Sequence, residues 1–119
     1  MHSVARDALE ACEAAIKPGR PMGEVFAAHA QVFDKAGLGH ARLNACGYAM
    51  GAIYNPIWVD FPMFYENNPT VMRESQVFFL HMILMDSDAG LAMCLGHSVE
   101  VTAHGAKRLS RHAPDLFEL

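Results

Sequence analysis

The amino-acid sequence predicts an α+β fold in which two N-terminal helices pack on one face of a mainly antiparallel sheet. Stretches with helical periodicity come first, strand-like stretches follow them, and no linker or low-complexity segment divides the chain. The chain has 119 residues, a length that supports one core. We therefore expect residues 1–119 to form a single domain.

The first helix is predicted over residues 3–17. Its apolar positions recur every three or four residues, at Val4, Ala8, Leu9, Cys12, Ala15 and Ile16. Ser3 is the expected N-cap, because its hydroxyl can accept a hydrogen bond from an amide of the first turn. Pro18-Gly19 ends the helix, since the residue before a proline avoids helical geometry.

A second helix is predicted over residues 22–36, again from apolar residues at helical spacing. Gly37 and Gly39 end it, because glycine tolerates the left-handed conformation of a helix terminus. His29 lies within the apolar stripe. We interpret it as a partly packed histidine rather than a metal ligand, because no second ligand residue lies at a helical offset from it.

The periodicity changes after the second helix. Residues 44–53 are small and apolar and predict a short strand. Residues 54–69 are rich in proline and aromatic residues and predict a long ordered loop. Residues 77–85 are apolar throughout except for His81, so we expect a central strand that is buried on both faces.

Two more strands are predicted near the C-terminus. Residues 86–90 form the turn after the central strand, and residues 91–102 form its antiparallel partner. A tight turn at residues 103–105 leads to a short strand over residues 106–109. The residues that follow are predicted to be a polar tail.

Composition and charge exclude several classes of function. The net charge is −4, whereas nucleic-acid binding requires clustered Lys and Arg residues. We interpret the one dense basic cluster as part of a solvated tail; its residues are Lys107, Arg108 and Arg111. Nucleic acid is therefore not an expected partner. The longest apolar run, residues 77–85, is too short to span a membrane. Charged residues make up 18% of the chain against a usual value of about 25%, so we expect some apolar surface to meet another protein.

Cysteine usage and the N-terminus indicate a reducing, cytoplasmic compartment. Cys12, Cys46 and Cys94 are an odd number of cysteines without a paired metal-binding spacing. The N-terminus lacks the charged segment followed by an apolar segment that a signal peptide has. Both observations favour a cytoplasmic protein.

His81 is the most informative single residue. It interrupts an apolar strand, and an unpaired buried imidazole costs about 1–3 kcal/mol, so we expect the fold to supply a hydrogen-bond partner. His97 is the expected companion, because pairing of the strands over residues 77–85 and 91–102 would let both histidines face one cleft. Two histidines without a third ligand do not make a zinc site. Structural roles are favoured for both, and acid or base chemistry stays open as the alternative.

Four motifs carry a resemblance to a known family. They are Lys17-Pro18-Gly19 with Gly23-Glu24-Val25, Cys46-Gly47-Tyr48-Ala49-Met50-Gly51, Val77-Phe78-Phe79-Leu80-His81-Met82 and Ser98-Val99-Glu100-Val101-Thr102-Ala103-His104-Gly105. In this order they resemble the C-terminal half of the pita-bread catalytic domain of the creatinase, prolidase, aminopeptidase P and methionine aminopeptidase family. The resemblance covers essentially the whole chain and implies half of a pita-bread fold with a strongly curved sheet.

The resemblance also implies that the metal site of the family is lost. The metal-binding His of the family falls on Tyr48, and its two Glu ligands fall on His81 and Gly96. A second functional His falls at or beside Asn55, and two Asp ligands would lie upstream of Met1. A dinuclear site needs oxygen ligands to hold two dications. We therefore expect no bound metal, no other cofactor and no metallopeptidase reaction.

Metal-free members of this family cleave a small C–N bond with acid and base groups. By this resemblance the candidate catalytic residues are Tyr48, His81 and His97. The candidate substrate-binding residues are Asn55, Trp58 and Phe61, which would line a cleft for a small-molecule ligand.

Two functions of different classes stay open. The chain is either the C-terminal piece of a creatinase-like or Xaa-Pro-peptidase-like hydrolase, inactive or weakly active alone, or a non-catalytic module that dimerises or binds a small molecule. The pocket of the family forms between two halves, so we expect a homodimer in which a second copy replaces the missing N-terminal half. If the gene continues upstream of Met1, an N-terminal half on the same chain would complete the site instead.

Overall fold

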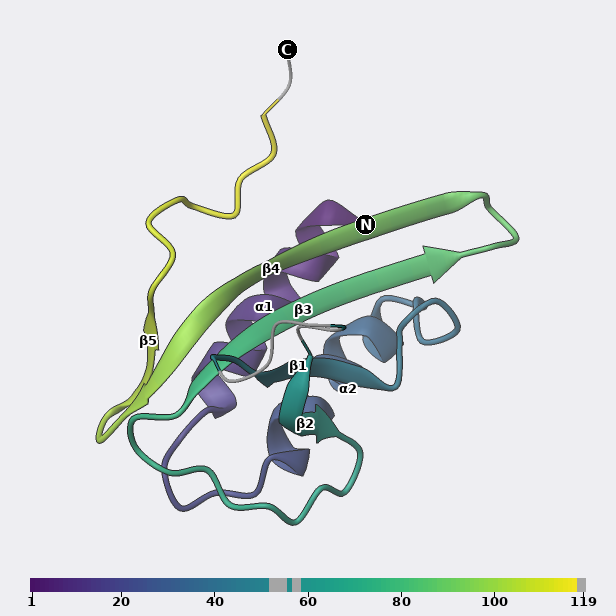
Figure 1. Ribbon diagram of the computed structural model, residues 1–119. Helices are drawn as coiled ribbons and strands as arrows, with labels where there is room; N and C mark the ends of the chain where they lie inside the picture. The colour runs from purple at the N-terminus through teal and green to yellow at the C-terminus, as the bar shows by residue number, and fades with distance from the viewer. Residues whose placement is uncertain (52–55, 57–58, 118–119) are drawn as a thin grey trace.

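The computed structural model of the protein describes residues 1–51, 56 and 59–117. It contains helices α1 (His2–Ala15) and α2 (Gly23–Lys35) and strands β1 (Ala45–Ala49), β2 (Asp60–Tyr65), β3 (Val77–Asp86), β4 (Leu91–Thr102) and β5 (Gly105–Arg108). The strands form an antiparallel five-stranded sheet in the order β2-β1-β3-β4-β5. Both helices lie on one side of this sheet (Figure 1), which confirms the predicted α+β architecture.

Both helices follow their predicted patterns, with small shifts at their ends. Helix α1 begins at His2, with Met1 as its N-cap and no hydrogen bond from a capping side chain. The predicted role of Ser3 as N-cap is wrong, because the Met1 carbonyl already accepts the amide of Ala5 at 2.9 Å and helical bonding starts earlier. After α1 the chain turns through Gly19, whose φ of +82° suits glycine.

Each helix buries one stripe of side chains. Helix α1 packs on α2 and on β3, β4 and β5, whereas α2 also packs on β1 and β2. The buried stripes consist of Ala5, Ala8, Leu9 and Cys12 in α1 and of Val25, Phe26, His29 and Phe33 in α2. Among the residues that the structure describes, neither these helices nor any other is long and apolar enough to cross a membrane.

Strand β2 corrects the prediction of a continuous loop over residues 54–69. It pairs with β1, with Ala45 opposite Tyr65 and Tyr48 opposite Met63. Proline normally argues against a strand, but β2 lies at the edge of the sheet, where Pro62 removes no ladder hydrogen bond that the sheet needs. The last two residues of the strand predicted over 44–53 lie outside the described residues.

Strand β3 is central, as predicted, but it is not buried on both faces. Phe78, Leu80, Met82 and Leu84 are fully buried beneath the helices, whereas the alternate residues are half-buried or exposed. The sequence of an uninterrupted apolar run does not indicate which face of the strand is more exposed to solvent, because apolar and polar residues do not alternate along it. We call the side of the sheet opposite the helices the front face. Its β3 residues are Val77, Phe79, His81, Ile83 and Met85.

Strands β3 and β4 form a long hairpin, and its turn agrees with the prediction. Asp86 lies opposite Leu91 at the end of the ladder. The Oδ1 atom of Asp86 accepts the amide of Ala89 at 3.0 Å, and Gly90 has a φ of +65°. The turn predicted at residues 103–105 is one residue shorter in the structure, because β4 ends at Thr102 and β5 already begins at Gly105.

Candidate functional site

Three ring side chains meet on the front face. Tyr48 comes from β1 and lies opposite Phe79 of β3, and His81 follows Phe79 on the same face of the strand. The ring centroids are 5.7 Å apart for Tyr48 and Phe79, 6.1 Å for Tyr48 and His81, and 5.1 Å for Phe79 and His81. The imidazole meets both aromatic rings edge to face, at 71° and 73°. These contacts favour one orientation of the imidazole.

His81 has a hydrogen-bond partner on the neighbouring strand. Its Nε2 atom lies 2.9 Å from Sγ of Cys94, an exposed free cysteine of β4. Burial lowers the pKa of His81, so its imidazole is neutral at neutral pH and Nε2 can accept the thiol hydrogen. The expectation that the fold supplies a partner for His81 is confirmed, but that partner is Cys94 rather than His97.

A pocket of about 250 Å³ lies beside this ring cluster. It is lined by Leu43, Ala45, Gly47, Tyr48, Val59, Met63, His81 and Ile83. Its described wall is largely apolar, and within it the side chains of Tyr48 and His81 are able to form hydrogen bonds. The volume and lining suit a small, mostly apolar molecule with one polar end. The structure thus brings two of the three predicted catalytic residues together.

His97 lies on the opposite side of the sheet from His81. His97 pairs with Leu80 of the buried core, and His81 pairs with Gly96. The prediction that both histidines face one cleft is wrong. His81 lies opposite Gly96, the residue before His97, and successive residues of a strand point to opposite faces of the sheet. A catalytic role for His97 stays a prediction that the front-face pocket does not support.

His97 instead joins a polar cluster that ties α1 to the sheet. Its Nε2 contacts Oε1 of Glu13, and Nη2 of Arg108 donates to the two carboxylate oxygens of Glu13 at 2.9 and 3.1 Å. Burial lowers the pKa of His97, an effect that Glu13 opposes and Arg108 reinforces. Arg108 lies in β5, within the strand predicted over residues 106–109, but it forms this bidentate ion pair instead of the solvated group expected of the basic cluster. The cluster has a structural role.

Gly96 occupies the position where the family resemblance places a bridging glutamate, and it has no room for a side chain. A Cβ atom on Gly96 would lie 2.4 Å from the carbonyl oxygen of Leu80 and 2.8 Å from Cζ of Phe79. Contacts this short require the backbone of β3 or the Phe79 ring to move. The Phe79 ring therefore occupies space that a carboxylate would need.

The residues present do not fit a dinuclear metal centre. Tyr48 and His81 supply one phenol and one neutral imidazole, and Gly96 supplies no side-chain donor. Within residues 1–51, 56 and 59–117, no group of three His, Cys, Asp or Glu side chains could hold a metal ion. Two dications need several carboxylates to balance their charge. The front face therefore does not suit the two-metal chemistry that the resemblance describes.

Of the three predicted substrate-binding residues, the structure describes Phe61, which is not among the residues that line the pocket. Phe61 on the edge strand β2 is 74% exposed. Asn55 and Trp58 lie outside the described residues. Met63 is a lining residue that the sequence did not indicate, because only the pairing of β1 with β2 brings it beside Tyr48.

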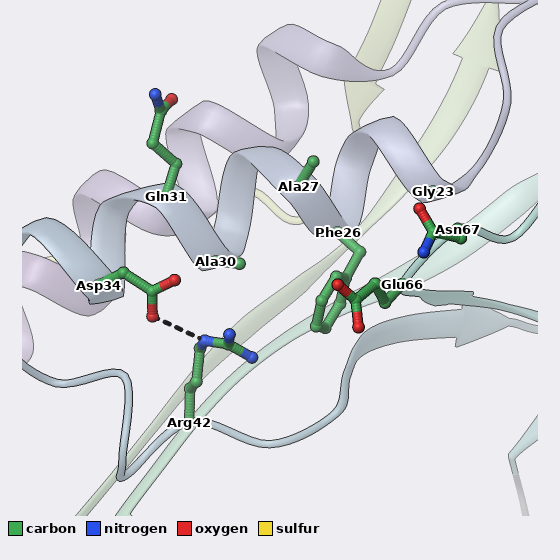
Figure 2. Close-up of a pocket in the computed structure, with 9 residues that line it drawn as sticks. All are labelled: Gly23, Phe26, Ala27, Ala30, Gln31, Asp34, Arg42, Glu66 and Asn67. Carbon is green, nitrogen blue, oxygen red and sulfur yellow. Dashed lines mark hydrogen bonds and ion pairs between the residues drawn. The ribbon is translucent and has the colours of Figure 1, made fainter.

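A second pocket, of about 330 Å³, lies between α2 and the turn after β2 (Figure 2). Nε of Arg42 donates to Oδ1 of Asp34 at 3.0 Å, and the guanidinium carbon lies 5.5 Å from the centre of the Phe26 ring. Figure 2 shows this pair at one end of the pocket and Glu66 and Asn67 at the other. Because Arg42 is engaged by Asp34 and by the ring, these contacts have a structural explanation, and we place the candidate site on the front face.

Comparison with known proteins gives a family match and a set of similar folds. The model of metallopeptidase family M24 matches residues 1–103. No curated protein sequence matches the chain. Solved structures match almost all of it at low sequence identity, and at such identities the likeness concerns the fold.

Three of these structures illustrate the range. Dipeptidase PepE from Mycobacterium ulcerans is 21% identical with a TM-score of 0.85, and the match covers 97% of this chain and 30% of that chain. The X-Pro aminopeptidase from Thermotoga maritima is 16% identical with a TM-score of 0.86, over 98% of this chain and 32% of that chain. The N-terminal domain of FACT complex subunit SPT16 from chickpea, Cicer arietinum, is 15% identical with a TM-score of 0.75, over 95% and 28%. The chain spans about 30% of the length of these proteins.

Proposed function

Because the chain belongs to metallopeptidase family M24, we propose that it is the counterpart of the C-terminal part of an M24 hydrolase that has lost metal-dependent peptide cleavage. By itself it is inactive or weakly active as a peptidase. Its front-face pocket, beside Tyr48 and His81, binds a small molecule instead. The dipeptidase and X-Pro aminopeptidase activities named for the similar structures belong to those proteins.

One observation carries this proposal: the position of the bridging glutamate is Gly96, and its side-chain space is taken. The carbonyl oxygen of Leu80 and the ring of Phe79 both lie within 3.0 Å of the position that a Cβ would occupy. A single substitution of Gly96 by an acidic residue would therefore not supply a ligand, because its side chain would meet the Leu80 carbonyl and the Phe79 ring.

The remaining groups support binding and at most weak acid or base chemistry. The neutral imidazole of His81 can accept a proton or a hydrogen bond. Apolar side chains such as Leu43 and Ile83 form the rest of the pocket wall. Such a wall can hold a small apolar group but cannot hold the charged ends of a dipeptide without further partners.

We expect the protein to release no proline from Xaa-Pro dipeptides above the background rate, with or without added Mn²⁺ or Co²⁺. The reason is the missing set of oxygen ligands that would activate a bridging water. Chromatography of the released proline measures the reaction, with the Xaa-Pro dipeptidase from Bacillus anthracis, another protein of similar fold, as the positive control in the same buffer. Metal-stimulated turnover that disappears in His81→Ala would contradict the proposal.

A second candidate function is a dimerising module, which the exposed apolar residues of the sheet favour. Phe79 and Ile83 are only half-buried on the front face, and Met85 on the same face at the end of the hairpin is 59% exposed. An apolar patch of this kind is typical of an interaction surface. The occupant that we propose is a second copy of this chain, because a self-complementary patch closes most simply about a twofold axis. SPT16, a protein with a similar fold, is by its name a subunit of a complex.

On this second proposal the protein sediments as a dimer, at twice its chain mass of 13.1 kDa. Ile83→Glu is expected to shift it to the monomer, because an unpaired carboxylate buried in the interface costs several kcal/mol. Leu116→Glu is the matched control, since Leu116 is 61% exposed in the C-terminal segment. Analytical ultracentrifugation over a dilution series makes the measurement. A monomer at every concentration would exclude the dimerising module and leave the first proposal standing.

A further inference from the structure

The contact between Cys94 and His81 pairs a nucleophile with a base, and the proposed function does not use it. Cys94 lies opposite Ile83 in the β3–β4 ladder, which places it diagonally across from His81 on the front face. Its Sγ atom is 2.9 Å from Nε2 of His81. Cys94 is exposed, whereas Cys12 and Cys46 are buried. The strand register thus holds one accessible thiol within hydrogen-bond reach of an imidazole.

We propose that Cys94 and His81 form a nucleophilic thiol–imidazole pair that exchanges with small disulfides and leaves a mixed disulfide on Cys94. As Sγ attacks one sulfur of the disulfide, Nε2 of His81 accepts the thiol proton. The new bond joins Sγ to that sulfur, the disulfide bond of the reagent breaks, and the leaving thiolate keeps the electron pair and takes the proton back from His81. Cys94 is oxidised and the second half of the reagent is reduced to a thiol.

The surroundings of His81 suit the role of the base. Among the described residues, the titratable groups that face it are Tyr48 on β1 and Cys94 on β4, and its edge-to-face contacts with Tyr48 and Phe79 limit its rotation. Burial lowers the pKa of His81, so the imidazole is unprotonated at neutral pH, the state in which it can accept the thiol proton.

The neighbouring pocket indicates which disulfides would react best. His81 and Ile83 belong to the pocket wall and also flank Cys94. A reagent with a small aromatic group can place that group against the apolar wall while its sulfur meets Sγ. The chemical class that we infer is a small disulfide with an apolar or aromatic substituent.

The reaction of the native protein with 4,4′-dithiodipyridine tests the pair. The released thiopyridone gives the rate by absorbance, and peptide mass spectrometry gives the site. We expect one thiol per chain to react rapidly, at Cys94, and Cys94→Ser to abolish this phase. His81→Gln is expected to slow it at least about tenfold at pH 7, since general-base assistance is lost. His104→Gln, an exposed histidine outside the pocket, is the matched control and should react like the parent protein.

Two outcomes would overturn the inference. One is an equal rate in the parent protein and His81→Gln; the other is mass-spectrometric labelling at Cys12 or Cys46 before Cys94. A variant that has unfolded is recognised because all three cysteines then react. If a second copy of the chain covers Cys94, the reaction rate should rise as the protein is diluted. If the thiol itself is unreactive, the rate should stay low at every protein concentration. The result does not depend on peptidase activity, so it can fail while the proposed function holds.

Discussion

Gly96→Ala is expected to lower the free energy of unfolding by about 2–3 kcal/mol, because it overpacks the centre of the sheet. The added methyl group would lie 2.4 Å from the carbonyl oxygen of Leu80, which is backbone and cannot rotate away. It would also lie 2.8 Å from the Phe79 ring. Relief therefore requires β3 and β4 to separate locally, at the cost of ladder hydrogen bonds. Urea unfolding followed by circular dichroism measures the change.

Gly39→Ala is the matched control for this experiment. A Cβ on Gly39 would lie 2.4 Å from Oδ1 of Asp34, the end of a side chain that can move, so we expect a loss below about 1 kcal/mol. Gly96→Glu should cost at least as much as Gly96→Ala and should not create a metal site. Equal stability of Gly96→Ala and the parent protein would show that the packing around Phe79 is looser than the structure indicates.

His29 is expected to make the fold sensitive to acid, with about 3 kcal/mol lost between neutral pH and pH 4. The side chain is fully buried in α2, and neither ring nitrogen has a hydrogen-bond partner among the described residues. It packs against Phe33 with ring centroids 4.8 Å apart. Burial, reinforced by Arg42 and opposed by Asp34, lowers the pKa of His29 from 6.5 to about 4. The sequence predicted a partly packed histidine, and the structure buries it completely.

The direction of the effect follows from where the protons bind. Unfolded chains take up a proton at His29 below about pH 6.5, whereas the folded protein does so only near pH 4. The contribution of neutral His29 to stability is therefore complete above pH 6.5 and is lost progressively as the pH falls to about 4. Replacing the imidazole by an apolar group of similar size removes this dependence.

His29→Leu against the parent protein measures the effect. We expect the difference in the free energy of unfolding to grow in favour of His29→Leu as the pH is lowered from 7 to 4. His104→Gln, which changes an exposed histidine, should run parallel to the parent protein. Parallel curves for His29→Leu and the parent would contradict this prediction, because they would mean that His29 has the same pKa in the folded and the unfolded protein.

Much of the fold was predictable because periodicity reports directly on burial. Helix α1 buries Ala8, Leu9 and Cys12 of the stripe that its spacing indicated, and glycine marks the turns at Gly19 and Gly90. Strand β2 was not predictable by the same rules. Tolerance of Pro62 depends on the edge position of β2, which is a property of the sheet and not of the local sequence.

The candidate site was predictable only in part, because the register of strand pairing determines which side chains lie on the same face of the sheet. Tyr48 and His81 were candidates by resemblance and do meet on the front face, but a shift of one residue in the strand pairing decides whether His97 joins them. Local sequence does not fix that shift. The contact of His81 with Cys94 depends on the same register, and the blocked space at Gly96 depends on the position of the Phe79 ring. Neither leaves a motif in the sequence.

The most direct test of this account is equilibrium dialysis against Mn²⁺, which measures whether the protein binds metal ions at the positions where the family resemblance places the metal ligands. Mn²⁺ prefers carboxylate and other oxygen ligands, whereas Tyr48, His81 and Gly96 supply one phenol and no carboxylate, and the described part of the chain has no group of three metal-binding His, Cys, Asp or Glu side chains. We expect no saturable binding and far less than one ion per chain. Saturable uptake of two ions per chain that is lost in Tyr48→Ala and His81→Ala would contradict this account.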